Sequence, residues 1–135
     1  MFLIPTYLAP SPIHGTGVFT PVPIKAGTIL WRLDPSTDWE IPPEDFARFP
    51  EPYQSRLRAY AYQNFEGVYI LCGDNARYMN HADDPTCDDS GQVITVARRD
   101  IAAGEELTCD YRLFDAESAG VGGALYAPVE LARTG

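Results

Sequence analysis

The chain has 135 residues, of which 45% are hydrophobic, and its formal net charge is −9. This length favours a single globular domain, and the hydrophobic fraction excludes an intrinsically disordered chain. The acidic balance disfavours direct binding to nucleic-acid phosphates and favours a basic protein or peptide as partner, although a charged surface also serves solubility.

Three cysteines, Cys72, Cys87 and Cys109, are spaced in a way that matches no zinc site. We therefore expect no bound metal. Reduced thiols are typical of a cytoplasmic protein, so we expect a cytoplasmic location. If the source is a pathogen or a virus, the protein would act in the host cell. The apolar start of the chain has no basic flank and is too short for a signal peptide. No apolar stretch is long enough to span a membrane, so we expect no membrane partner.

The first third of the chain predicts short strands separated by turns. Twelve prolines and eleven glycines disfavour long helices. The predicted elements are a strand at 2–9 that is ended by Pro10 and Pro12, a tight turn at 15–17, a turn at 24–27 and a strand at 28–33.

Residues 34–62 differ in character and predict helix. A proline followed by two acids at 43–45 is typical of a helix start, because the acids lie near the positive end of the helix dipole. Pro50 ends this helix, and Pro52 can begin another with apolar residues at helical spacing. We expect one or two short helices over residues 43–60.

The second half of the chain returns to strands. Residues 101–106 repeat the turn pattern of residues 24–27, with an isoleucine three positions before a glycine. The predicted elements are strands at 67–71, 92–98 and 107–111, a helical turn at 76–81, and a flexible Ala/Gly/Ser-rich linker after Phe114.

Three separated segments carry the most specific signal. They are Ile13-His14-Gly15-Thr16-Gly17-Val18-Phe19, Ala76-Arg77-Tyr78-Met79-Asn80-His81 and Gly104-Glu105-Glu106-Leu107-Thr108-Cys109-Asp110-Tyr111. In order and spacing they resemble the signature segments of the SET domain, the fold of many protein-lysine methyltransferases, over about residues 10–115. Three motifs in the right order are far more specific than any one of them.

The resemblance implies a mostly β fold with short helices, a β-clip-like SET domain whose C-terminal strand is threaded under a loop as a pseudoknot. It divides the chain into a SET domain at 1–115, with an insert at 34–62 that helps to form the substrate groove, and a flexible tail at 116–135. Many members of the family bind zinc through cysteines after this domain. Since no cysteine follows Cys109, that tail or a second subunit would have to close the active site.

The resemblance also implies a reaction, the transfer of a methyl group from S-adenosylmethionine to the ε-amine of a lysine in a protein. S-adenosylhomocysteine is the product, and no metal is needed. The amine must be neutral to react, yet a free lysine has a pKa of about 10.4. A desolvated aromatic channel lowers that pKa and aligns the two reactants.

Catalytic and channel residues follow from the third segment and from the insert. Tyr111 matches the tyrosine whose hydroxyl lies at the methyl-transfer site, and Tyr60 is the second catalytic candidate, with Tyr62 beside it in the channel. Cys109 stands where the family usually has phenylalanine or tyrosine. The smaller side chain predicts a wider channel, which would permit di- or trimethylation.

Cofactor-binding residues follow from the first two segments. Gly15, Thr16 and Gly17 match the loop whose backbone amides reach the cofactor. Asn80 would hold the methionine amine through its side-chain carbonyl, and the backbone of His81 would meet the adenine edge. The remaining candidates are Met79, from the same segment, and Phe114 as the adenine-stacking aromatic, with Tyr126 in reserve.

Two departures from the family pattern lie after the Asn-His pair. Ala82 lacks a hydroxyl, and Thr86 replaces an amide that would pin the loop, so we expect weaker packing there. A buried or exposed ion pair between Arg77 and Glu106 is a further expectation.

Two other functions stay open at this point. One is a SET-like module that binds a peptide without catalysis, and the other is a methyltransferase for a small amine. The acidic loop, defined as Asp83, Asp84, Asp88 and Asp89, is read as a solvated loop, with docking of a basic peptide as the alternative and a calcium site disfavoured by its spacing. A homodimer is a further expectation, because very small members of the family can dimerise.

Overall fold

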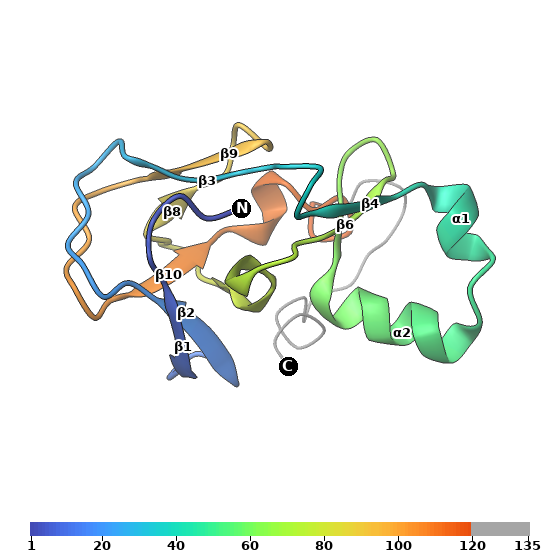
Figure 1. Cartoon of the computed structure of the whole chain (residues 1–135), viewed down its shortest axis with the longest axis horizontal. Helices are drawn as coiled ribbons and strands as arrows, with labels where there is room; N and C mark the ends of the chain where they lie inside the picture. Colours follow the sequence, from blue (N-terminus) through green and yellow to red (C-terminus); the bar gives the residue numbers. More distant parts are fainter. Residues whose placement is uncertain (120–135) are drawn as a thin grey trace.

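The computed structural model describes residues 1–119 as three small sheets with two short helices at one end (Figure 1). The first sheet has the order β1-β2-β10-β7, with β1 at Tyr7–Pro10, β2 at Thr16–Phe19, β10 at Glu106–Cys109 and β7 at Asn80–His81. The second has the order β3-β9-β8, with β3 at Ile29–Arg32, β9 at Ile94–Ala97 and β8 at Cys87–Asp88. The third has the order β4-β6-β5, with β4 at Trp39–Ile41, β6 at Tyr69–Leu71 and β5 at Tyr62–Gln63.

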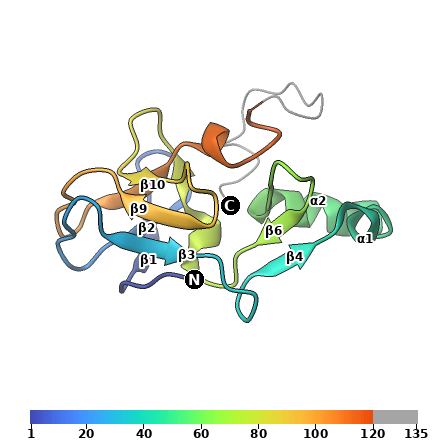
Figure 2. The ribbon, with the colours of Figure 1, turned by 90° about the horizontal axis from the view of Figure 1, so that it is seen from above.

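The insert forms the helical end of the molecule. Helix α1 at Pro43–Ala47 and helix α2 at Glu51–Tyr60 flank the third sheet, away from the other two sheets (Figure 2). The Phe46 ring of α1 stacks on Tyr69 of β6 with ring centroids 3.8 Å apart, and Ile41 and Leu57 complete this cluster. Of the one or two short helices predicted over residues 43–60, the structure forms two, and each begins with proline in its first turn.

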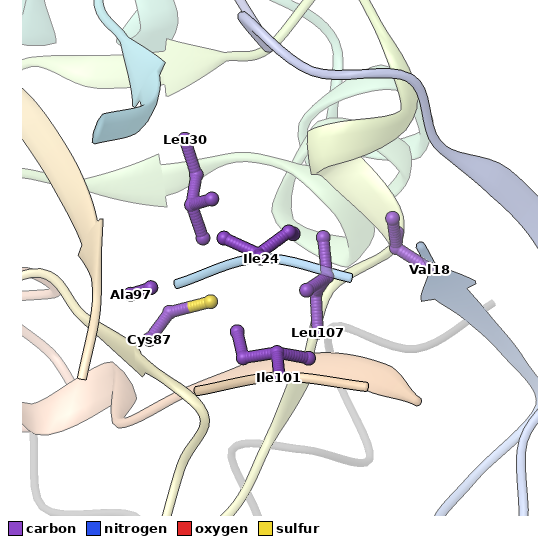
Figure 3. Close-up of a cluster of buried hydrophobic side chains, with 7 residues drawn as sticks. All are labelled: Val18, Ile24, Leu30, Cys87, Ala97, Ile101 and Leu107. Atoms are coloured by element: carbon purple, nitrogen blue, oxygen red, sulfur yellow. The ribbon is translucent and has the colours of Figure 1, made fainter. Parts of the chain in front are cut away.

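The main core lies between the first two sheets (Figure 3). Val18 of β2 and Leu107 of β10 are opposite each other in the antiparallel ladder, and both are fully buried. Burying one such aliphatic side chain stabilises the fold by roughly 1.5–3 kcal/mol. The cluster consists of Val18, Ile24, Leu30, Cys87, Ala97, Ile101 and Leu107. Burial raises the pKa of the Cys87 thiol to about 12, so this cysteine is a neutral core residue.

The two similar turns pair with each other across the core. Ile24 and Ile101 exchange both backbone hydrogen bonds, each with an N···O distance of 2.8 Å. Gly27 and Gly104 then adopt φ values of 85° and 87°, a region that only glycine enters at low cost. The predicted similarity of the two turns is confirmed, and it places β3 and β10 after equivalent reversals of the chain.

Several element boundaries differ from the predicted ones. The strand predicted at 2–9 begins only at Tyr7, because Pro5 has no backbone N–H, and Phe2 makes a single bridge to Trp31. In the tight turn predicted at 15–17, only Gly15 has a positive φ, 48°, and the next two residues already belong to β2. The helical turn predicted at 76–81 is a 3₁₀-helix, η1 at Asn75–Tyr78, followed by β7.

The final strand is shorter than the predicted 107–111. It ends at Cys109, and a second 3₁₀-helix, η2 at Tyr111–Leu113, follows it. The side chain of Asp110 caps this helix by accepting from the Arg112 N–H. The change from strand to helix turns Tyr111 out of the ladder. The threading of this segment as a pseudoknot stays a prediction.

Thr86 pins its loop more firmly than expected. Its backbone N–H donates to the Thr108 hydroxyl at 3.0 Å, and its own hydroxyl accepts from the Thr108 N–H at 2.9 Å. Both side chains are 5% exposed, so these reciprocal bonds satisfy backbone groups that water cannot reach. The expectation of weaker packing at Thr86 is therefore wrong, because hydrogen bonds between Thr86 and Thr108 pin the loop in place of the missing amide.

We expect Thr86→Val to lower the free energy of unfolding by about 1–3 kcal/mol, because the buried N–H of Thr108 would lose its acceptor while the side-chain volume stays the same. Urea unfolding monitored by circular dichroism measures this change. Thr28→Val, at a half-buried position before β3, is the matched control. An equal loss of stability in both variants would contradict a special role for the Thr86 hydroxyl.

Candidate functional site

A narrow cavity of about 50 Å³ lies between the insert and the C-terminal segment. Its lining contains both predicted catalytic residues and both predicted channel residues. Side chains from the insert, η1, β10 and η2 meet here, although they are far apart in the sequence. The lining residues that the sequence singled out are Tyr60, Tyr62, Met79, Cys109, Tyr111 and Phe114.

Tyr111 is held rigidly in this cavity. Its side chain is 2% exposed, and its hydroxyl donates to the backbone carbonyl of Met79 at 2.5 Å. Its backbone N–H donates to Nδ1 of His81 at 3.1 Å. A hydroxyl that donates to a carbonyl presents its oxygen as an acceptor to other groups, so Tyr111 and Met79 together place two oxygens at one end of the cavity.

Neighbouring side chains enclose Cys109, while the wider channel predicted from its small size stays a prediction. Cys109 is 2% exposed, and Met79 and Phe114 pack against the cluster that it forms with Tyr111. The Phe114 ring is edge-on to Tyr62, with centroids 4.9 Å apart, and it also contacts Tyr111 at 5.9 Å. Phe114 is thus a wall of the cavity, while its predicted stacking on adenine stays a prediction. Tyr126, the reserve candidate, lies outside the described residues.

The first and second motifs meet around one buried amide. Asn80 is fully buried, and its Nδ2 donates to the His14 carbonyl and to Oε2 of Glu106, both at 3.0 Å. A carbonyl and a carboxylate can only accept, which fixes the amide orientation. A Cβ on Gly17 of β2 would lie 2.4 Å from the same Glu106 oxygen, so a larger residue here would displace the Glu106 carboxylate. We call Asn80, Glu106 and residues 14–17 the amide cradle.

Two buried polar atoms of the amide cradle have no hydrogen-bond partner, the Oδ1 of Asn80 and the Nδ1 of His14. A buried carbonyl oxygen without a partner costs free energy, so its presence needs an explanation. The predicted cofactor would supply a hydrogen-bond donor for this oxygen, because its methionine amine is cationic. These residues therefore fit the cofactor that the sequence predicts, and His14 is a candidate that the prediction of site residues missed although it lies in the first motif.

The predicted pair of Arg77 and Glu106 is not formed. Glu106 accepts from Ser11 at 2.8 Å and from Asn80, while Nε of Arg77 donates to the Cys72 carbonyl at 3.0 Å. Glu106 thus braces the amide cradle, and Arg77 lines the cavity.

His81 contacts the C-terminal segment through its imidazole ring as well as through the pairing of β7 with β10. Nδ1 accepts from Tyr111, so the ring proton resides on Nε2, which donates to Asp83 at 3.0 Å. The imidazole therefore positions the start of η2, a role that the sequence did not suggest. The predicted contact between the backbone of His81 and adenine stays a prediction.

The segment after η2 is tied to the insert. The carboxylate of Asp115 is fully buried and accepts from the Gln63 N–H at 3.0 Å and from the Ser118 hydroxyl at 2.5 Å. The Ala116 N–H donates to the Gln63 carbonyl at 2.7 Å. Residues 115–118 therefore differ from the flexible tail that was predicted to start at 116, and residues 120–135 of that tail lie outside the described residues.

The cavity also has polar lining residues, which the sequence did not single out as site residues. Asp89, Gln92 and Thr95 line it together with Trp31. Burial raises the pKa of Asp89 to about 6, and the charges of Asp88 and Asp110 act in the same direction, against a hydrogen bond from the Thr95 hydroxyl. The run of acids in the acidic loop could have drawn attention to Asp89, but nothing in the sequence shows that it turns inward.

The described residues form neither a metal site nor a membrane-spanning helix. Residues 1–119 contain no group of three His, Cys, Asp or Glu side chains that could hold a metal ion. Cys72, Cys87 and Cys109 are all buried. Within the same range, the helices are too short and too polar to cross a membrane.

We expect Asp89→Asn to stabilise the protein at neutral pH relative to the native chain. An aspartate in the unfolded chain titrates near about 3.9, so between pH 4 and pH 6 the folded state binds the extra proton and native stability falls as the pH rises. The stability gained by the variant should therefore grow from pH 4 to pH 7, by up to about 3 kcal/mol. Urea unfolding at several pH values measures this.

Asp88→Asn is the control of opposite sign, because hydrogen bonds from Ser90 hold the pKa of Asp88 below its ordinary value. Asp88→Asn should lower the free energy of unfolding as the pH rises above about 4, whereas Asp89→Asn should raise it. If both variants show the same pH dependence, the burial of the Asp89 charge is not the cause.

Comparison with known proteins accounts for this arrangement. The model of the SET domain family matches residues 15–112. The chain is 30% identical over 116 residues to the histone-lysine N-methyltransferase ATX2 of Arabidopsis thaliana, an alignment that covers 77% of this chain and 10% of that protein. It is 32% identical over 123 residues to the histone-lysine N-methyltransferase trr of Drosophila melanogaster, covering 82% and 5%. The chain thus spans a tenth or less of the length of these two relatives.

Solved structures agree with this result at the level of the fold. A humanised Polycomb Repressive Complex 2 of Chaetomium thermophilum matches with a TM-score of 0.58 and 24% identity, over 80% of this chain and 15% of that chain. A protein of Plasmodium falciparum matches with a TM-score of 0.56 and 21% identity, over 79% and 96%. The mostly β fold with short helices is therefore confirmed, and the chain belongs to the SET domain family.

Proposed function

We propose that this protein transfers a methyl group from S-adenosylmethionine to the ε-amine of a lysine in a protein substrate. One observation carries the proposal: the Tyr111 hydroxyl and the Met79 carbonyl meet in an aromatic cavity, and Asn80, the residue after Met79, belongs to the amide cradle. A channel for an amine and a site for a cationic ligand thus adjoin through one peptide bond.

When bound, the cofactor supplies a methyl group on a sulfonium, which is electrophilic without help from a metal. The protein then has to bind the two reactants, align them and exclude water from the site. Oδ1 of Asn80 accepts from the cationic amine of the cofactor, and the oxygens of Tyr111 and Met79 orient the lysine amine and contact polarised C–H groups. The aromatic walls exclude water and lower the pKa of that amine.

The acidic character of the chain supports a basic protein as substrate. The net charge of −9 attracts basic peptides, and both curated relatives described above are named histone-lysine N-methyltransferases. Because Met79 and Phe114 fill part of the space that Cys109 leaves, we propose that the number of methyl groups accepted depends on these three side chains.

The competing function is the binding of a peptide without catalysis. Cys109, at a position where the family usually has an aromatic residue, is the observation that favours it. Such a module would keep the aromatic cavity and have no use for the open acceptor of Asn80. Cofactor binding therefore separates the two functions.

We expect the protein to bind S-adenosylmethionine and S-adenosylhomocysteine with micromolar affinity in calorimetric titration. Asn80→Ala should weaken binding by about tenfold to a hundredfold, because it removes an acceptor for a charged donor. Asn75→Ala is the matched control, because its amide donates to Thr6 and does not reach the cradle. Thermal melts establish that each variant is folded. If the folded protein does not bind either ligand at millimolar concentration, the enzyme proposal is contradicted.

We expect Tyr111→Phe to reduce kcat by about a hundredfold or more, because misplaced reactants cost roughly that much in rate. Its affinity for the cofactor should stay within a few fold of the native value. Methyl transfer from labelled cofactor to a panel of lysine-rich proteins, including histones, gives the rate. Tyr53→Phe is the control, as Tyr53 lies on α2 and is 40% exposed. A Tyr111→Phe variant that retains native kcat would remove this hydroxyl from the mechanism.

A further inference from the structure

Two of the residues that line the cavity each have one buried atom with unmet hydrogen-bonding capacity. Oδ2 of Asp89 has no hydrogen-bond partner, and neither has Nε1 of Trp31, whose side chain is 5% exposed. Both residues line the same cavity as Tyr111. One atom is an acceptor and the other a donor, and both belong to residues that line one cavity.

The other oxygen of Asp89 is already fixed. The Thr95 hydroxyl donates to Oδ1, which anchors the carboxyl group to β9 and limits its rotation. The neighbouring Gln92 adopts a φ of 65°, a conformation that non-glycine residues rarely take. The loop that carries Asp89 is therefore held in a costly conformation with its carboxylate directed inward.

The charge of Asp89 is not balanced by its surroundings. The charged groups that act on it most are Asp88 and Asp110, both acids. Arg77 lines the cavity, but its Nε donates to the Cys72 carbonyl. The thiol of Cys87 is neutral at physiological pH. An ionised Asp89 in an aromatic cavity is thus a strong site for an incoming cation.

The dimensions of the cavity limit what this cation can be. A volume of about 50 Å³ holds about four water-sized groups, which matches the unbranched end of a lysine side chain. The aromatic wall of Tyr60, Tyr62 and Phe114 suits the methylene groups, and a carboxylate suits the terminal ammonium. A guanidinium is planar and wider, and it fits this shape less well.

We propose that the Asp89 carboxylate binds the ammonium group of the target lysine as it enters the cavity, and so selects a primary ammonium side chain. This inference rests on the proposed function, since it names a specificity residue of the same site. A water that accepts from the Trp31 N–H and from the ammonium can donate to Oδ2, which satisfies both open atoms. Asp89 is then an anchor for the charged form, while Tyr111 and Met79 meet the amine at the site of transfer.

The test uses a probe that does not require catalysis. n-Butylammonium chloride reproduces the end of a lysine side chain, and 1-butanol is its neutral counterpart of similar size. The indole N–H signal of Trp31 in nuclear magnetic resonance detects binding in the cavity, because Trp31 is one of its lining residues. The second tryptophan, Trp39, is 45% exposed and serves as an internal reference.

We expect n-butylammonium to shift the Trp31 signal in a saturable, millimolar titration, and 1-butanol to bind at least tenfold more weakly. Asp89→Asn should weaken n-butylammonium binding by at least tenfold, whereas Asp88→Asn, which keeps the cavity intact, should not. Because a protonated Asp89 carries no charge, binding to the native protein should also weaken as the pH falls below about 6. Equal binding by the Asp89 and Asp88 variants, equal binding of the two probes, or no shift in the native protein would overturn the proposal.

Kinetics with a lysine peptide separates this inference from the proposed function. Asp89→Asn should raise KM by about tenfold while kcat changes less, the opposite of the pattern expected for Tyr111→Phe. If n-butylammonium binds through Asp89 but no substrate is methylated, the ammonium site stands and the enzyme proposal falls. If methylation proceeds with an unchanged KM in Asp89→Asn, the enzyme proposal stands and the role of Asp89 falls.

Discussion

One buried side-chain amide holds the site together. Asn80 is fully enclosed, and its two N–H groups reach the loop before β2 and the carboxylate at the start of β10. In the sequence, His14 lies 66 residues before Asn80 and Glu106 lies 26 residues after it. Because a buried amide is costly unless its donors are satisfied, the loop, β7 and β10 must take up one relative position. That position also brings the Met79 carbonyl to the Tyr111 hydroxyl.

The same principle explains why so many polar side chains are buried in such a small protein. Thr86, Thr108 and Asp115 have partners for their buried groups and connect segments that no hydrophobic contact would align. Asn80, His14, Asp89 and Trp31 each keep one buried atom without a partner, and all four belong to the proposed binding sites. A ligand that hydrogen-bonds to these atoms would restore the stability that is given up there.

The cavity is formed by parts of the chain that fold on separate sheets. The insert contributes Tyr60 and Tyr62, and the segment after β10 contributes Tyr111 and Phe114. Asp115 joins the two by accepting from the backbone of Gln63, so the edge-on contact of Phe114 with Tyr62 does not depend on ring packing alone. The width of the channel is therefore coupled to the way in which the insert is attached.

The sequence by itself determined the family, the order of the principal strands, the two helices around Pro50 and the set of aromatic residues around Tyr111. These depend on local patterns, such as glycine at positive φ, proline at helix starts and motifs at fixed spacing. Only the tertiary structure decided that Thr86 replaces an amide, that Glu106 braces Asn80, and that Asp89 turns inward while Asp88 hydrogen-bonds to its own loop. Two-residue strands have no periodicity to detect, and the direction of a side chain in a loop depends on contacts with distant residues.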